Sequence, residues 1–168
     1  MAHPHPDTAA TSVQCAVLTV SDTRTPETDK SGTLLRTRLT DAGHRIQAYE
    51  LLKDEPEQVR QQVQHWVTDD DIDAILLNGG TGIAPRDTTY EAIATLLTKT
   101  LPGFGELFRQ LSYAEIGSRA IASRAIAGVC HTTLIFSMPG STKAVALAID
   151  QLILPELVHL TTQLRGQP

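Results

Sequence analysis

Apolar residues along the chain fall into five short runs that predict buried strands. The first run, VQCAVLTV, is almost continuously apolar, which is typical of a strand covered on both faces of a sheet. The five runs cover residues 13–20, 46–52, 72–77, 125–129 and 133–138. They predict a sheet with a layer of helices on each side.

Between these runs, apolar residues recur at helical spacing. Pro56 suits the first turn of a helix, and Pro155 predicts a bend in the last one. The alternation of strands and helices favours an α/β fold, a three-layer α/β/α sandwich around a mostly parallel sheet. The predicted helices lie near residues 34–43, 56–67, 88–97, 101–111 and 141–164.

The chain has 168 residues, which is enough for one domain with a core and too few for two. Residues 1–12 are expected to be a disordered tail, and residues 13–168 a single domain. The start has no basic segment followed by an apolar stretch, so it does not resemble a secretory signal. No apolar run comes close to the roughly 20 residues of a membrane-spanning helix. We therefore expect a cytoplasmic protein with no membrane partner.

The composition of the chain limits the kinds of core and ligand that it can have. Hydrophobic residues make up 41% and aromatic residues 4%, so the core must be aliphatic. The net charge of −5 argues against general binding of nucleic acid but leaves a small anionic ligand open. Cys15 and Cys130 lie in apolar runs, which favours buried thiols over a disulfide or a zinc site.

The third strand runs into LNGGTGIAPRD, residues 77–87, which is rich in glycine. Ligands bind outside the carboxyl ends of strands in open α/β sheets, and glycines let backbone N–H groups approach an anion. A tight turn followed by a helix cap explains the stretch equally well. Asp87 or Thr88 can cap the next helix, and Thr88 with Glu91 fits a capping box. The stretch matches no standard nucleotide loop, since GxxxxGK[ST] and GxGxxG are both missing.

Two further strand exits carry polar chemistry. In MPGSTK, residues 138–143, Ser141 is a natural N-cap, and Lys143 suits either a nearby anion or open solvent. In LLKDEP, residues 51–56, Asp54 and Glu55 are either helix-capping acids or site residues. Parallel strands would bring all three exits to one edge of the sheet, which favours a binding site there.

Five segments, in this order, resemble the MoaB/MogA family of molybdenum cofactor biosynthesis proteins and the related G domain of gephyrin. They are GGTGIAPRD, TTYEAI, PGFGELFRQLS, SRAIAGV and MPGSTKA. The match runs from about Val13 to the final helix. The last two segments are closer to the MoaB branch.

This resemblance implies a MogA-like fold that binds molybdopterin. In active members, AMP passes from ATP to molybdopterin with Mg²⁺, ahead of molybdate insertion. By the same resemblance, Asp54 and Asp87 are catalytic and hold Mg²⁺. The family pattern also implies a set of substrate-binding residues: Ser21, Asp22, Gly79, Gly80, Thr81, Gly82, Pro139, Gly140, Ser141 and Lys143.

The chain departs from the family pattern at Lys53, Pro85 and Tyr90, which affects ligand affinity more than identity. A carrier that binds molybdopterin without catalysis, or an oligomeric scaffold, is the alternative function. The resemblance also implies a homotrimer or a pair of trimers and contacts with other proteins of the pathway. The apolar run over residues 120–138 fits either such a contact or the core.

Overall fold

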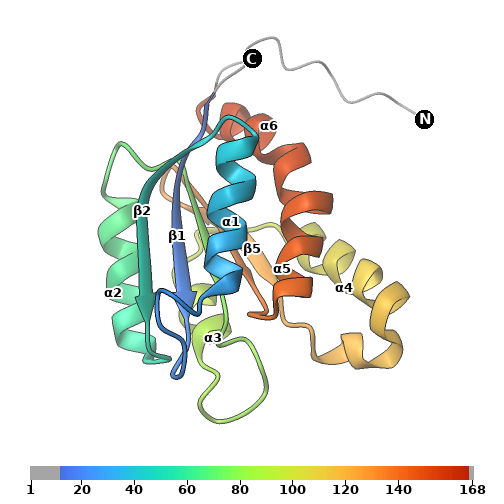
Figure 1. Ribbon diagram of the computed structural model, residues 1–168. Coiled ribbons are helices and arrows are strands. Elements are labelled where there is room, and N and C mark those ends of the chain that lie inside the picture. The colour runs from blue at the N-terminus through green and yellow to red at the C-terminus, as the bar shows by residue number, and fades with distance from the viewer. Residues whose placement is uncertain (1–11, 167–168) are drawn as a thin grey trace, which may run out of the picture.

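The computed structural model describes residues 12–166, which form a six-stranded sheet in the order β2-β1-β3-β6-β5-β4 (Figure 1). The expected tail over residues 1–12 lies outside the described residues apart from Ser12. The strands are β1 (Gln14–Val20), β2 (Arg45–Leu52), β3 (Ala74–Asn78), β4 (Lys99–Thr100), β5 (Ile126–Cys130) and β6 (Thr133–Met138).

The sheet is mostly parallel, as the alternation of elements predicts. Strands β2, β1, β3 and β6 pair in parallel, whereas β5 runs antiparallel to both β6 and β4. The four parallel strands therefore end at one edge, which lies at the bottom of Figure 1. The glycine-rich stretch leaves β3 at that edge, so the fold places all three polar strand exits together.

Helices cover both faces of the sheet because buried strand residues alternate between two apolar clusters. Cys15 and Val17 of β1 pack with one cluster, and Ala16 and Leu18 with the other. The first cluster contains residues of α1 (Lys30–Asp41), α4 (Pro102–Ile116), α5 (Thr142–Ala148) and α6 (Leu154–Leu164). The second contains residues of α2 (Pro56–Val67) and α3 (Thr89–Ala94). The α/β/α sandwich is thus confirmed.

The long C-terminal helix is interrupted before Pro155 by a π-helical turn, η2 (Ile149–Ile153). Proline lacks an N–H and its ring crowds the preceding turn, so a wider turn accommodates it. The whole run, Thr142–Leu164, is 23 residues with a mean hydropathy of 1.4, long and apolar enough to span a membrane. The expectation that no apolar run reaches this length was wrong. In this fold Val145, Ile149 and Leu157 of the run are buried in the first apolar cluster, and 33% of the most apolar window of the run is buried.

Some elements carry too weak a sequence pattern to be predicted. Strand β4 has two residues, and the 3-10 helix η1 (Gly117–Ala122) continues α4 toward β5. In Figure 1, α4 and η1 extend away from the body of the domain. Both cysteines are buried and unpaired, as expected. The run over residues 120–138 forms β5 and β6, so most of it belongs to the core.

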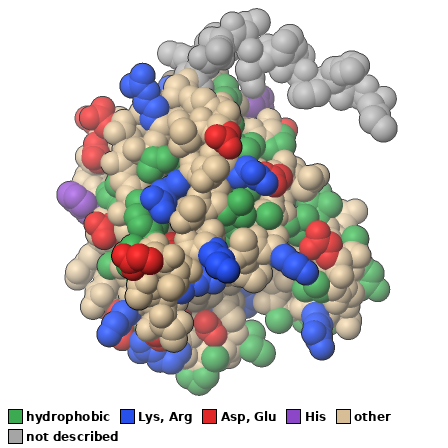
Figure 2. All heavy atoms as spheres, in the orientation of Figure 1, with side chains coloured by type: hydrophobic (Ala, Val, Ile, Leu, Met, Phe, Trp, Pro, Cys, Tyr) green, Lys and Arg blue, Asp and Glu red, His purple; other side chains and the backbone are tan. Residues whose placement is uncertain are grey.

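Acidic and basic side chains are interspersed over the face that carries α1 and α5 (Figure 2). No large region of one sign covers that view. The distribution agrees with a chain whose net charge is modest and negative.

Candidate functional site

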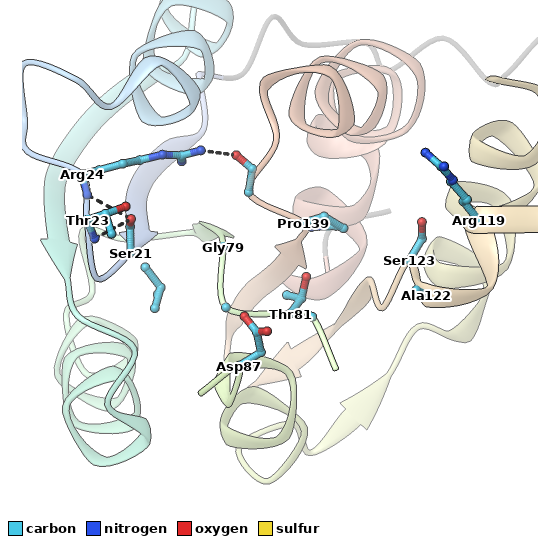
Figure 3. Close-up of a pocket in the computed structure, with 14 residues that line it drawn as sticks. Ser21, Thr23, Arg24, Gly79, Thr81, Asp87, Arg119, Ala122, Ser123 and Pro139 are labelled. Atoms are coloured by element: carbon cyan, nitrogen blue, oxygen red, sulfur yellow. Dashed lines mark hydrogen bonds between the residues drawn. The ribbon is translucent and has the colours of Figure 1, made fainter. Parts of the chain in front are cut away.

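A cavity of about 390 Å³ opens at the edge where the parallel strands end. Its wall comes from the loop after β1, the glycine-rich stretch after β3, the end of β6 and the segment around η1. Figure 3 shows Ser21 and Arg24 on one side and Arg119 and Ser123 on the other, with Asp87 between them. The lining residues are Val20, Ser21, Thr23, Arg24, Gly79, Gly80, Thr81, Gly82, Asp87, Arg119, Ala122, Ser123, Pro139 and Gly140.

The twelve candidate site residues divide into two groups. Eight line the cavity: Ser21, Gly79, Gly80, Thr81, Gly82, Asp87, Pro139 and Gly140. Four lie outside its lining: Asp22, Asp54, Ser141 and Lys143. Ser141 accepts a hydrogen bond from the N–H of Ala144 and caps α5, and Lys143 is exposed on the first turn of that helix.

Glycine is required at Gly79 and Gly80, the first two positions of the loop. Their φ angles are +98° and +64°, in the left-handed region that side chains rarely adopt. A Cβ at Gly79 would lie 2.0 Å from the carbonyl oxygen of Val20. The loop therefore passes directly against the end of β1.

Backbone N–H groups are left free along this loop. Among the described residues, no acceptor pairs with the N–H groups of residues 80–83, whereas the N–H of Gly79 bonds to Met138. A run of unpaired backbone donors at a strand exit is suited to a bound anion.

Ser21 and Arg24 give the loop after β1 its shape. The Ser21 hydroxyl accepts hydrogen bonds from the N–H groups of Thr23 and Arg24, at 3.3 and 3.1 Å. The Arg24 guanidinium donates to the carbonyl of Gly140 at 2.8 Å, the dashed bond in Figure 3. It also lies 3.6 Å from the buried carboxylate of Asp29. Arg24 thus joins two walls of the cavity.

Arg119 and Ser123 come from the η1 segment on the opposite wall (Figure 3). Arg119 is exposed and has no acidic partner among the described residues. Arg24, Arg119 and Ser123 were missed by the sequence reasoning. For Arg119 and Ser123 the only signal was the motif SRAIAGV and the residues before it, whose position in the fold was not evident without η1; Arg24 follows the first strand in the same loop as Ser21.

Asp87 lies against the glycine loop that precedes it. Its Oδ2 accepts a hydrogen bond from the N–H of Ala84 at 3.2 Å and would lie 2.5 Å from a Cβ at Gly82. The carboxylate closes its own loop and does not cap α3. It faces the cavity, where it can meet a cation or a ligand.

Asp54 is buried behind the loop, with 5% of its surface exposed. Its Oδ1 accepts hydrogen bonds from the hydroxyl and the N–H of Thr88, at 2.7 and 3.2 Å. Burial raises the pKa of this carboxyl; the bonds from Thr88 oppose the rise, and the charges of Asp87 and Asp22 add to it. Asp54 therefore lies within electrostatic reach of Asp87.

These bonds overturn the capping box expected at the start of α3. The Thr88 hydroxyl is turned to Asp54 and makes no cap bond, and Glu91 pairs with Arg124. The bond to Arg124 lowers the pKa of Glu91. Charged partners from other parts of the fold replaced the local cap.

The surroundings of Gly80 are suited to a hard cation. A Cβ at this position would lie 2.1 Å from the Thr89 hydroxyl oxygen and 2.5 Å from Asp54 Oδ2. That hydroxyl is fully buried and has no hydrogen-bond partner. No group of three or more His, Cys, Asp or Glu side chains surrounds a metal position within residues 12–166. Proteins often hold Mg²⁺ with one or two carboxylates while substrate phosphates and water supply the other ligands, and Asp54 and Asp87 are the two carboxylates against this loop.

Asp22 accepts hydrogen bonds from both Asp54 and Arg86. Arg86 donates two hydrogen bonds to Asp22, at 3.0 and 3.1 Å, and one to Glu55 at 2.9 Å. Asp22 also accepts the N–H of Asp54 at 3.1 Å. The bonds from Arg86 lower the pKa of Asp22. These contacts connect three strand exits beside the cavity.

The chain is similar to known proteins over almost its whole length. Residues 16–159 match the family described as a probable molybdopterin binding domain. The chain is also 56% identical to molybdenum cofactor biosynthesis protein B of Bacillus subtilis over 162 residues, 96% of this chain and 95% of that one. The chain belongs to the MoaB/MogA family.

Solved structures of the family agree with this assignment. A crystal structure of molybdenum cofactor biosynthesis protein B has a TM-score of 0.92 at 52% identity, covering 95% of this chain and 99% of that one. The tungsten cofactor synthesizing protein MoaB of Pyrococcus furiosus has a TM-score of 0.84 at 32% identity, with coverages of 94% and 99%. A MogA structure has a TM-score of 0.82 at 26% identity, with coverages of 90% and 99%. The higher identity to protein B agrees with the expected MoaB branch.

Proposed function

We propose that the chain binds molybdopterin and transfers AMP from ATP to its terminal phosphate, releasing pyrophosphate. The observation that carries this proposal is the cavity at the strand exits, with free backbone N–H groups on one wall and Arg119 on another. Its volume of about 390 Å³ lies in the range of small-molecule sites. Family membership then supplies the ligand class.

The chain's own residues supply positioning and charge. The N–H groups of the glycine loop would bind an anionic group of a ligand, and Arg119 would neutralise charge across the cavity. Phosphoryl and nucleotidyl transfer depend mainly on such positioning and electrostatic stabilisation. Free donors and an unpaired cation are therefore the features that this chemistry needs.

Asp54 and Asp87 are the residues that would hold Mg²⁺, and the buried Thr89 hydroxyl lies beside Asp54. When bound, this ion would neutralise charge on the phosphates. Asp54 is enclosed behind the loop and Asp87 faces the cavity. We infer that Asp87 meets the ligand side and that Asp54 supports the site from behind.

The test is release of pyrophosphate from ATP in the presence of Mg²⁺ and molybdopterin. We expect release that needs all three components and stops when EDTA removes the ion. Tight binding of molybdopterin without pyrophosphate release would favour the carrier function instead. Absence of molybdopterin binding would refute the proposal as a whole.

The remaining expectations stay predictions. They are a homotrimer or a pair of trimers, contacts with other proteins of the molybdenum cofactor pathway, a cytoplasmic location, and no binding to nucleic acid or membrane.

A further inference from the structure

We infer that Arg124 is a positioning residue that fixes the carbonyls of Thr81 and Gly82, and with them the free N–H groups of the glycine loop, before a ligand binds. The inference deepens the proposed function and rests on it for the identity of the ligand. Arg124 lies between η1 and β5, outside the cavity lining, more than 40 residues from the loop it contacts.

The Arg124 guanidinium holds two successive carbonyl groups of the glycine loop. Its Nε donates to the carbonyl of Thr81 at 2.9 Å, and its Nη2 donates to the carbonyl of Gly82 at 2.7 Å. The rigid fork of an arginine can hold both carbonyls at once, which a lysine cannot do.

Fixing a carbonyl also fixes the N–H of the next residue. Peptide bonds are planar, and no cis bond occurs in the described residues, so C=O and N–H of each peptide point in opposite directions. The Thr81 carbonyl is paired with the N–H of Gly82, and the Gly82 carbonyl with the N–H of Ile83. Both N–H groups therefore point away from Arg124, and they are among the free donors of the loop.

The guanidinium is itself held in place by α3. Both terminal nitrogens of Arg124 donate hydrogen bonds to the Glu91 carboxylate. The guanidinium carbon lies 4.9 Å from the centre of the Tyr90 ring. The side chain of Arg124 is only 25% exposed. Because the arginine is fixed in this way, the loop is set before a ligand arrives, which reduces the ordering cost of binding.

The experiment compares Arg124→Gln and Arg124→Lys with two control variants. Glu91→Gln removes the charged partner but leaves both carbonyl bonds possible. Arg38→Gln removes a different arginine–carboxylate pair, between Arg38 of α1 and Asp150 of η2. Thermal melting of all four variants shows which of them fold as the parent does.

The first readout is the loop itself, in crystal structures that need no ligand. We expect Arg124→Gln to lose the fixed orientation of the peptides after Thr81 and Gly82, and Glu91→Gln to keep it. A loop that is unchanged in Arg124→Gln would overturn the inference, whatever the protein turns out to bind.

The second readout is the affinity for MgATP and for molybdopterin, measured by calorimetry. We expect Arg124→Gln to weaken the ligand that contacts the loop by roughly tenfold or more, and Arg124→Lys to recover part of the loss. Arg38→Gln should stay within about threefold of the parent, and Glu91→Gln, which keeps both carbonyl bonds, should lose less than Arg124→Gln. In turnover assays the loss should fall on KM more than on kcat.

A loss in Arg38→Gln as large as that in Arg124→Gln would show that the effect does not depend on the loop carbonyls and would overturn the inference. A parent that binds neither ligand would refute the proposed function, while the crystal structures would still decide the role of Arg124.

Discussion

At the scale of single residues, substitution of Asp87 distinguishes a catalytic role of this side chain from a structural one. Its carboxylate closes the loop through Ala84 and faces the cavity. Asparagine keeps an acceptor for that bond, so Asp87→Asn should melt near the parental temperature. Loss of the charge should lower AMP transfer by about a hundredfold or more, as for other electrostatic groups in active sites. If Asp87→Asn transfers AMP at the parental rate, the role of Asp87 is limited to closing the loop.

Asp54→Asn should show the same loss of transfer without a loss of stability. Burial raises the pKa of Asp54 in the folded chain, so its ionisation costs stability as the pH rises through that pKa. Asparagine removes this cost and still accepts the bonds from Thr88. At neutral pH we expect a melting temperature equal to or above the parental value.

The two carboxylates should also be coupled. If both serve one metal site, the double variant should lose less activity than the two single losses combined. Independent, fully additive effects in a double-mutant cycle would contradict a shared site.

His44 makes the stability of the fold depend on pH. It is buried, and its Nδ1 accepts a hydrogen bond from the N–H of Val13 at 3.2 Å, which requires the neutral ring. Burial lowers the pKa of His44 below its ordinary value of 6.5. The unfolded chain then takes up a proton before the folded chain does. The stability that His44 contributes is therefore complete above the ordinary pKa and is lost as the pH falls through the lowered one.

Thermal melts between roughly pH 7 and pH 5 test this dependence. His44→Asn offers an acceptor that does not titrate in this range, so its stability should fall less steeply toward low pH. The exposed His65 provides the matched control, and His65→Asn should follow the parent. Parallel curves for all three proteins would show that His44 does not contribute.

At the scale of elements, the loop after β3 and the start of α4 respond oppositely to the same substitution. Gly80→Ala places a methyl group at a φ of +64° and against Thr89 and Asp54. We expect it to cost on the order of 2 kcal/mol or more of unfolding free energy. Gly103→Ala meets no atom within 4 Å in a helix and should stabilise by about 0.5–1 kcal/mol. Denaturant unfolding measures both, and a tolerated Gly80→Ala would show that the loop is not held tightly.

At the scale of the whole molecule, the exposed large apolar residues concentrate on the segment that extends from the body. Within residues 12–166, four of the five exposed large apolar side chains are on α4 and η1: Leu107, Tyr113, Ile116 and Ile121. Apolar surface of this kind favours association. We expect light scattering to give a mass of three or six chains of 18.2 kDa each. A stable monomer at micromolar concentration would contradict the expected trimer.

Local patterns in the sequence were enough to predict the layers of the fold and the edge of the sheet where the polar strand exits meet. The strands in VQCAVLTV and TLIFSM follow from local apolar periodicity, which depends on a few neighbouring residues. Once the ends of the strands are known, the glycine and acidic residues that follow them can be placed at one edge of the sheet. The family motifs added the ligand class and the two aspartates, and the match to the MoaB/MogA family confirms the family assignment.

Which polar groups contact one another depends on how distant segments of the chain pack together. Thr88 bonds to Asp54 and not to its own helix, and Arg124 reaches the carbonyls of Thr81 and Gly82. Arg24 reaches Gly140, 116 residues away. Such contacts join segments far apart in the sequence, and their free energy depends on burial and on the direction of each donor. No local pattern encodes either quantity, so these partners could be found only once the chain was folded.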